Sequence, residues 1–343
     1  MTLDATTLPV IWFALLGVLL AGYAILDGFD LGVGMMHHLV AHDDSERRLV
    51  MNTIGPIWDG NEVWLVTFGG ALFAAFPEAY ATVFSGFYTA FMLLLCALIL
   101  RAVSMEFRSK VRHATWRRVW DGAFTAGSTL AVLLFGVATG NVMRGLPLDA
   151  RGDFTGSLLD LLNPYALLVG VLTLTLFAMH GTIYLHLKTE GALRERTVAW
   201  MWRTFGCFLV AFVLTTMFTL VAVPRATQHL ADHPILWIVP VANVFAVANV
   251  PRAIYRGTPA AAFASSCATI VALVFLLGAA IFPDLVPALE PAHSLTVWNA
   301  ASSPRTLGIM LLIAAIGMPA VLAYTAAVYW TFRGKVRLDD HSY

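Results

Sequence analysis

The sequence predicts an all-α polytopic membrane protein, and three observations lead to this fold class. Hydrophobic residues make up 59% of the chain and charged residues only 12%, against about 45 to 50% and about 25% in soluble domains. The apolar residues gather in nine runs of about 20 residues, the length that a helix needs to cross the hydrocarbon core of a bilayer. Lys and Arg are distributed unevenly between the loops that join these runs.

Nine transmembrane helices are expected, because apolar runs this long can satisfy their backbone hydrogen bonds in lipid only as helices. The predicted spans are 9–36, 54–76, 80–101, 120–142, 163–187, 202–223, 234–255, 260–282 and 306–331. The loops between them are too short to fold separately, so residues 1–343 are expected to form a single transmembrane domain. No Lys or Arg precedes the first run and no typical cleavage site follows it, so a cleaved signal peptide is not expected.

The basic residues predict the orientation of the chain. Only Arg144, Arg151, Arg225 and Arg305 fall on one side of the nine spans, and the other 17 of the 21 Lys and Arg residues fall on the opposite side. Because cytoplasmic loops carry the excess of cations, the N-terminus is expected outside and the C-terminus in the cytoplasm. Acidic residues also number 21, so no net basic charge is available to hold nucleic acid.

Four acidic residues lie in or beside the first two apolar runs. Asp27 and Asp30, like Asp59 and Glu62, are three residues apart, which places each pair on one helix face. A short loop joins the two runs, so the helices are expected to be antiparallel neighbours. Intramembrane carboxylates are costly and commonly mark a proton or ion path. The structural alternative is that Asp59 caps its helix and Asp27 pairs with an Arg of a neighbouring helix.

Other residues give weaker indications. Trp58 and Trp64 are typical of the aromatic belt at a membrane interface, and Gly28 with Gly32 predicts close helix packing. His180 is the only His well inside an apolar run, and without a second ligand nearby a hydrogen-bonded helix contact is favoured over a haem or metal ligand. The three cysteines stand alone in separate runs. We therefore predict no catalytic residue and no metal ligand in this chain.

Long motifs spread over the whole chain can be compared with a known family. They include DGFDLGVG at 27–34, WDGNEVW at 58–64, GGALFAAFP at 69–77, SLTVWNA at 294–300 and HSY at 341–343. By these motifs the sequence closely resembles subunit II of the cytochrome bd-type quinol oxidases. The resemblance implies two four-helix bundles plus one peripheral helix, which agrees with the nine predicted spans.

The resemblance also implies an activity. The family's complex is a terminal oxidase of the bacterial cytoplasmic (inner) membrane that passes electrons from membrane quinol to O2. It gives water and a proton motive force without pumping protons. Haems b and d belong to the partner, subunit I, so this chain is expected to complete a heterodimer, to ligate no haem and to have little or no activity alone. Some members hold a structural quinone in subunit II or add a small single-helix subunit, and both remain open here.

Five residues take expected roles from the resemblance. Asp59 matches an acid that helps to conduct cytoplasmic protons, Asp27 and Asp30 match the acidic pair of the first helix, and Glu106 stands at a further acidic position. Trp64 matches a Trp at the mouth of an apolar oxygen passage. Two other hypotheses remain open on the residues alone: a stand-alone proton-coupled transporter that uses the intramembrane acids, and a structural scaffold in which they are incidental.

Overall fold

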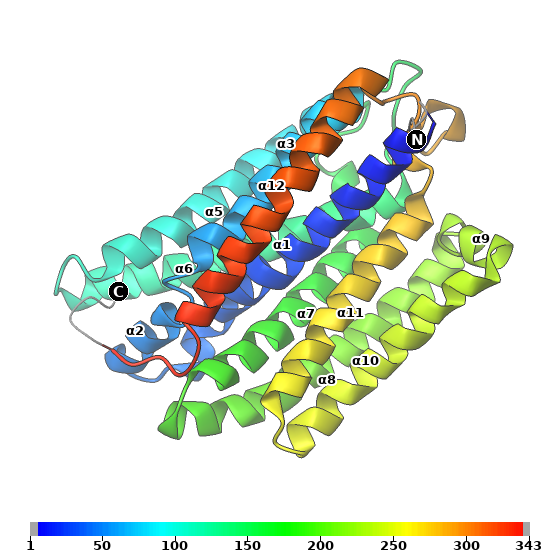
Figure 1. Ribbon diagram of the computed structural model, residues 1–343. Helices are drawn as coiled ribbons and strands as arrows, with labels where there is room; N and C mark the ends of the chain where they lie inside the picture. Colours follow the sequence, from blue (N-terminus) through cyan, green and yellow to red (C-terminus); the bar gives the residue numbers. More distant parts are fainter. Residues whose placement is uncertain (1–5, 339–343) are drawn as a thin grey trace.

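The long helices of the protein lie side by side along one common direction (Figure 1). The structure is a computed structural model that describes residues 6–338, apart from the side chains of His229 and Leu230. Eight helices in this part of the chain are long and apolar enough to cross a membrane. They are α1 (Thr7–Val40), α5 (Tyr88–Arg108), α6 (Ala114–Arg144), α7 (Pro164–Lys188), α8 (Gly191–Ala222), α10 (Ile238–Tyr255, extended by a 3-10 turn at Pro234–Trp237), α11 (Pro259–Ile281) and α12 (Pro304–Thr331). The helical membrane fold class is confirmed.

The second and third predicted spans differ most from the structure. Residues 54–101 fold as three helices, namely α3 (Trp58–Ala75), α4 (Pro77–Gly86) and the first part of α5. Non-helical backbone at Phe76 and at Phe87 separates them, and Pro77 begins α4 at a position where Pro is favoured. The predicted helix 80–101 was therefore wrong in its bounds. α3 is not among the eight apolar helices because its first turns are polar, so the count of nine spans stays a prediction.

Short elements fill the connections between the long helices. They are α2 (Asp44–Asn52), α9 (Arg225–Asp232), two 3-10 turns at Asp160–Leu162 and Pro291–His293, and strands β1 (Asp284–Val286) and β2 (Leu295–Thr296). The two strands pair in an antiparallel hairpin, a small departure from the all-α prediction. Strands of two or three residues are too short to show a periodic pattern in the sequence. The HSY motif at 341–343 lies outside the described residues.

The first and last long helices are tied together at one end. The indole N–H of Trp12 in α1 donates to the carbonyl of Leu307 in α12 at 3.0 Å, and that of Trp298 donates to the carbonyl of Thr6 at 3.3 Å. The start of α1 accordingly lies near the β1–β2 segment (Figure 1). These bonds join the start of α1 to the start of α12 and to the segment before it.

Helix α1 packs at the centre of the bundle, against α3, α6, α7 and α11. Its closest crossing is with α7, where a Cβ added to Gly32 would lie 2.0 Å from the carbonyl oxygen of Phe177. A Cβ on Gly181 would lie 2.4 Å from the carbonyl carbon of Gly32. The predicted close packing at the Gly28/Gly32 motif is confirmed, and any larger side chain at Gly32 or Gly181 would push the two helices apart.

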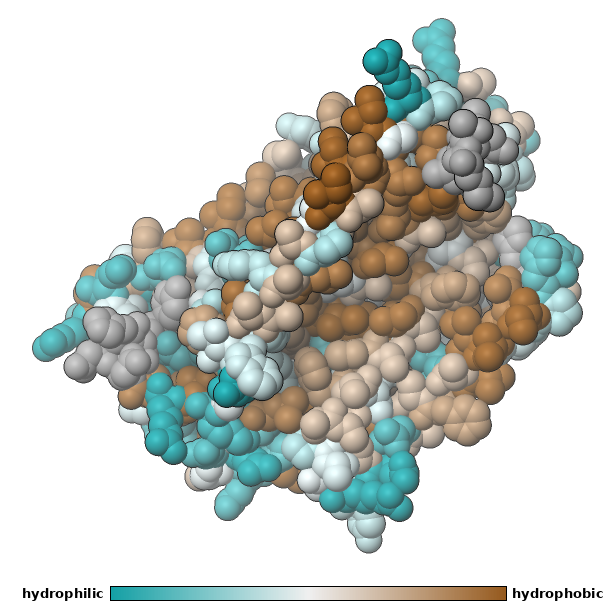
Figure 2. Space-filling view, in the orientation of Figure 1, coloured by the Kyte–Doolittle hydropathy of each residue, from teal (hydrophilic) through white to brown (hydrophobic). Residues whose placement is uncertain are grey.

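The surface is mainly apolar along the helices and polar at their ends. Figure 2 shows hydrophobic residues across the middle of the molecule and hydrophilic residues gathered at its edges. Among the eight apolar helices, α12 buries the smallest share of its residues, so it is peripheral in this chain. Such a surface faces lipid or another membrane subunit.

Candidate functional site

Asp27 belongs to a buried ion cluster that is formed by α1, α3 and α5. Its Oδ1 accepts a hydrogen bond from Nη1 of Arg101 at 2.6 Å, and both side chains are 0% exposed. A charge that is buried in a membrane protein must be paired, since an isolated charge costs several kcal/mol. The interpretation that Asp27 pairs with an Arg of a neighbouring helix is confirmed.

Arg101 joins a second acid to this cluster. Its Nη2 lies 3.5 Å from Oε2 of Glu62 in α3, and its guanidinium lies 5.8 Å from the centre of the Trp58 ring. Asp30 is close enough to interact electrostatically with the same guanidinium. Three carboxyl groups thus lie around one buried guanidinium.

Asp30 is held by an amide that connects three helices. Its Oδ2 accepts from Nδ2 of Asn61 in α3 at 2.8 Å, and the hydroxyl of Tyr329 in α12 donates to Oδ1 of Asn61 at 2.8 Å. Both Asp30 and Asn61 are buried. The tyrosine bond fixes the orientation of the amide, because a rotated Asn61 would turn its oxygen towards the carboxylate.

The other predicted residues lie at the edge of this cluster or outside it. Asp59 is exposed on α3, one turn from Glu62, and interacts with it electrostatically. Glu106 is exposed near the end of α5, about 7.5 Å along the helix axis from Arg101. Trp64 is half-buried, and its ring packs on Gly22, where an added Cβ would lie 2.4 Å from Cε3. The structure thus brings Asp27, Asp30 and Glu62 together, with Asp59 at their margin and Glu106 apart.

The sequence reasoning missed three members of the cluster. Arg101 ends the predicted span 80–101 and was counted only among the cations on the predicted cytoplasmic side, whereas the structure buries it inside α5. Asn61 and Tyr329 gave no signal as uncharged residues. The polar stretch that begins with Trp58 was the available indication. Within it, Asn61 contacts Asp30 and Glu62 contacts Arg101.

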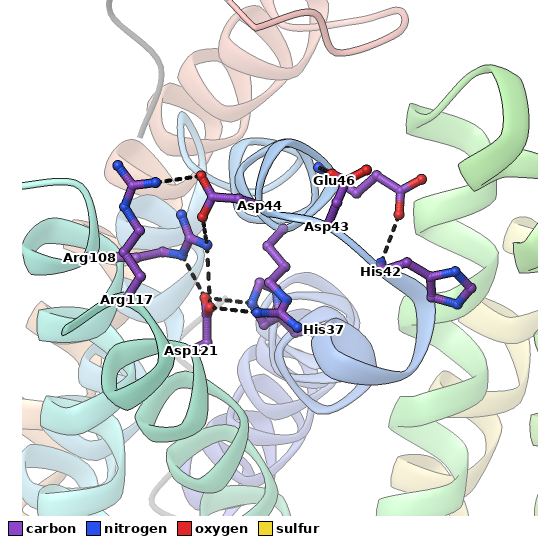
Figure 3. A network of polar contacts seen from close by, with 9 residues as sticks. His37, His42, Asp43, Asp44, Glu46, Arg108, Arg117 and Asp121 are labelled. Carbon is purple, nitrogen blue, oxygen red and sulfur yellow. Dashed lines mark hydrogen bonds and ion pairs between the residues drawn. The ribbon is translucent and has the colours of Figure 1, made fainter. Parts of the chain in front are cut away.

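A second ionic network ties α2 to the ends of α1, α5 and α6 (Figure 3). Its members are His37, Asp44, Arg47, Arg108, Arg117 and Asp121. Buried Asp121 accepts from Nε of Arg108 at 2.5 Å and hydrogen-bonds with Nε2 of His37 at 2.9 Å. Asp44 accepts from Arg108 at 2.8 Å and from Arg117 at 2.7 Å. This network anchors the connection between the two acid-bearing helices.

Glu46 on α2 completes this anchoring. It accepts a hydrogen bond from Arg196 of α8, and its Oε2 accepts from the backbone N–H of His42 at 2.7 Å. Burial favours the neutral carboxyl, but the bonds from Arg196 and His42 outweigh burial and hold the pKa of Glu46 below its usual value. The connection is therefore fixed by a carboxylate that is ionised at neutral pH.

His180 makes contacts between helices. Its Nδ1 lies 2.7 Å from Oγ of Ser266 in α11, and its Nε2 lies 3.0 Å from the carbonyl oxygen of Ile25 in α1. Over residues 6–338, no three His, Cys, Asp or Glu side chains are grouped in a way that could hold a metal ion. The hydrogen-bonded helix contact that was favoured from the sequence is confirmed for His180.

Fold and site together define a class of protein. The chain is a helical membrane protein with a buried cluster of one cation and several carboxyl groups, and ionisable groups at such a depth commonly mark a proton or ion path. Comparison with known proteins then identifies the family. A family model described as cytochrome bd terminal oxidase subunit II matches residues 8–332. The chain belongs to this family, as its sequence motifs indicated, and is therefore a member of an oxidoreductase complex.

Individual relatives agree with this assignment. Cytochrome bd-I ubiquinol oxidase subunit 2 of Escherichia coli (strain K12) is 36% identical over 369 aligned residues, which cover 98% of this chain and 97% of that protein. Cytochrome bd ubiquinol oxidase subunit 2 of Bacillus subtilis (strain 168) is 35% identical and covers 95% of this chain and 96% of that protein. The solved bd oxidase of Geobacillus thermodenitrificans matches with a TM-score of 0.77 and 17% identity over 95% of this chain and 98% of that chain, which shows the shared fold.

Proposed function

We propose that this chain is subunit II of a bd-type terminal oxidase in the bacterial cytoplasmic membrane. The complex oxidises membrane quinol, reduces O2 to water and generates a proton motive force without pumping protons. Family membership over nearly the whole chain supports the assignment, as do relatives described as subunits of ubiquinol oxidases. The observation that carries the proton-handling role is the buried cluster of Asp27, Glu62 and Arg101.

The proposed topology has nine spans in one transmembrane domain, with the N-terminus outside and the C-terminus in the cytoplasm. α3 is the ninth span, and its exposed apolar residues Val63, Val66 and Phe73 support this because they follow one face of the helix. We propose two four-helix bundles, which pack against each other where α7 meets α6 and α1. One is formed by α1, α3, α5 and α6 and the other by α7, α8, α10 and α11, with α12 peripheral.

Cytoplasmic protons would enter at Asp59 and reach the buried cluster through Glu62. The two residues lie about 4.5 Å apart along the axis of α3, and Glu62 leads to the guanidinium that also holds Asp27. Arg101 would stabilise whichever carboxylate is ionised, and this lowers the cost of moving a proton through a low-dielectric region. Asp30 extends the series by one helical turn. Glu106, exposed on α5, would add an acid at the cytoplasmic side.

Trp64 would border the passage of O2. Its half-buried ring fills the space over Gly22, where a glycine leaves the surface of α1 without a side chain. O2 is small and apolar, so it needs gaps in packing and no polar groups. The size of the side chain at Trp64 would therefore govern access.

Haems b and d would be carried by the partner, subunit I. The contacts of His180 support this division, because both of its ring nitrogens are engaged with Ser266 and Ile25 and neither is presented to a haem. Bound haem supplies the electron transfer and the reduction of O2 in such a complex. A structural quinone and a small single-helix subunit are further partners to look for in the purified complex.

The test is Asp59→Asn in the complex purified with subunit I, with Glu195→Gln as the control. Glu195 is also an exposed acid, near the start of α8. We expect quinol-driven O2 uptake per haem to fall at least about tenfold for Asp59→Asn, or about 1.4 kcal/mol in the barrier, with the haem spectrum unchanged. The control should keep its turnover. Unchanged turnover in both variants would favour the scaffold hypothesis, and a chain that purifies alone without haem would favour the transporter.

A further inference from the structure

We propose that His180 is a positioning residue that holds the acid-bearing turn of α1, residues 25–30, in place between two groups of helices. The proposal rests on the proposed proton-handling function of Asp27 and Asp30. His180 itself touches neither acid in the contacts described above. It acts through the backbone of α1 and through Ser266 of α11.

The hydrogen bonds of His180 have an assigned direction. A backbone carbonyl can only accept, so the nitrogen that faces Ile25, Nε2, carries the hydrogen and donates it at 3.0 Å. Neutral His180 then accepts at Nδ1 from the hydroxyl of Ser266 at 2.7 Å. The hydroxyl has one hydrogen, so while it donates to Nδ1 it does not donate to the carbonyl oxygen of Phe263, which lies 2.8 Å away. One imidazole of α7 thus links the backbone of α1 to a side chain of α11.

The faces of the imidazole are fixed as well as its nitrogens. His180 is 0% exposed, and its ring stacks on Phe263 with 4.8 Å between centroids and 10° between planes. Phe29, which stands between the two acids in the sequence, lies 6.0 Å from both rings and stacks on Tyr184 at 4.0 Å. The aromatic packing holds the plane of the His180 ring, which suits a group that sets the position of a neighbouring helix.

Two contacts with α7 bracket the acids along α1. His180 holds Ile25, and the next residue, Gly181, forms the closest backbone contact with Gly32. These points on α1 are about 10 Å apart along the helix axis, and Asp27 and Asp30 lie between them. On the other side, Arg101 and Asn61 hold the acids from α5 and α3. The turn is therefore held on one side by uncharged contacts with α7 and on the other by Arg101 and Asn61.

Loss of the His180 contacts would free α1 to shift against α5 and α3. A displacement of about 1 Å is enough to change the rate of a well-positioned reaction by up to about 10²-fold. The 2.6 Å bond between Asp27 and Arg101 leaves little room for such a shift. We expect the shift to slow proton delivery and to leave quinol binding unchanged, because no quinol contact is assigned to this turn.

The experiment compares His180→Gln, His180→Phe and the control His186→Phe in the complex with subunit I. Gln can donate to Ile25 and accept from Ser266, whereas Phe keeps the ring stacking and loses both bonds. His186 lies on the same helix, is also buried and bonds to Thr197 at 2.9 Å. We expect His180→Phe to lower kcat per haem about tenfold with an unchanged KM for quinol, His180→Gln to restore most of it, and His186→Phe to lower thermal stability alone.

Two results would overturn the proposal. One is an unchanged kcat per haem in His180→Phe, which would make His180 a structural residue only. The other is a loss in His180→Gln as large as that in His180→Phe. If His180→Phe does not assemble, Ser266→Ala removes one bond only and should lower kcat by a smaller factor, and an unchanged kcat would again refute the idea. Amide hydrogen exchange in residues 25–30 should rise in His180→Phe whether or not Asp59→Asn supports the proton path. This measurement therefore distinguishes a failure of the positioning proposal from a failure of the proposed proton path.

Discussion

Replacement of Arg101 tests the physical account of the buried cluster most directly. Arg101→Met keeps a side chain of similar length and removes the cation that pairs with Asp27 and Glu62. Removing one partner of a buried ion pair typically costs about 3 to 5 kcal/mol, because the other charge is left without compensation. Both atoms of the 2.6 Å bond are fully buried here, so we expect a loss of at least about 3 kcal/mol, or more than about 100-fold in the unfolding equilibrium.

A double-mutant cycle separates the ion pair from general disruption. If the cost of Arg101→Met comes from the abandoned carboxylate, Asp27→Asn in the same chain should recover part of it. The double variant should then be no less stable than Arg101→Met alone, and the coupling energy should reach about 3 kcal/mol. Detergent-titrated unfolding of the purified complex gives these differences, with Arg118→Met, an exposed cation on α6, as the matched control.

Two outcomes would refute this reasoning. A loss below about 1 kcal/mol in Arg101→Met would mean that the pair is solvated or replaceable, as exposed pairs are. Additive losses from Asp27→Asn and Arg101→Met would mean that the two side chains act independently.

Two more predictions follow from the geometry of the site and of α2. Trp64→Ala opens the space over Gly22, so the apparent KM for O2 should change while the yield of assembled complex stays near that of the parent; an unaltered O2 affinity would count against the oxygen passage. Glu46 has a lowered pKa, so the stability that it contributes is present above the usual pKa of Glu and is lost as the pH falls through the lowered value. Glu46→Gln should therefore destabilise the complex at pH 7 and match the parent in strong acid, and a pH-independent difference in melting temperature would contradict this.

Composition and apolar runs were sufficient to predict the membrane fold class, because lipid leaves few choices to a long apolar segment. The end of α3 at Phe76 agrees with the predicted end of the second span, whereas the break at Phe87 falls inside the predicted span 80–101 and was missed. The two acids of α1 were recognised because an intramembrane carboxylate is rare. Their partners were not, since Arg101 is 74 residues from Asp27 and Tyr329 is 268 residues from Asn61. Contacts at such separations depend on how the helices pack, and a single sequence does not record this.

The pairing of Asp27 with Arg101 has a consequence for the biogenesis of the protein. At synthesis rates of about 5 to 20 residues per second, Asp27 leaves the ribosome about 4 to 15 seconds before Arg101 does. Throughout that interval the two carboxyl groups of α1 have no Arg101 to neutralise them. Until α5 arrives, the two carboxyl groups must therefore remain protonated, or α1 must stay near the aqueous interface or be held by the insertion machinery. The bond between Trp12 and Leu307, 295 residues apart, closes later still, so the bundle is completed only when its last helix enters the membrane.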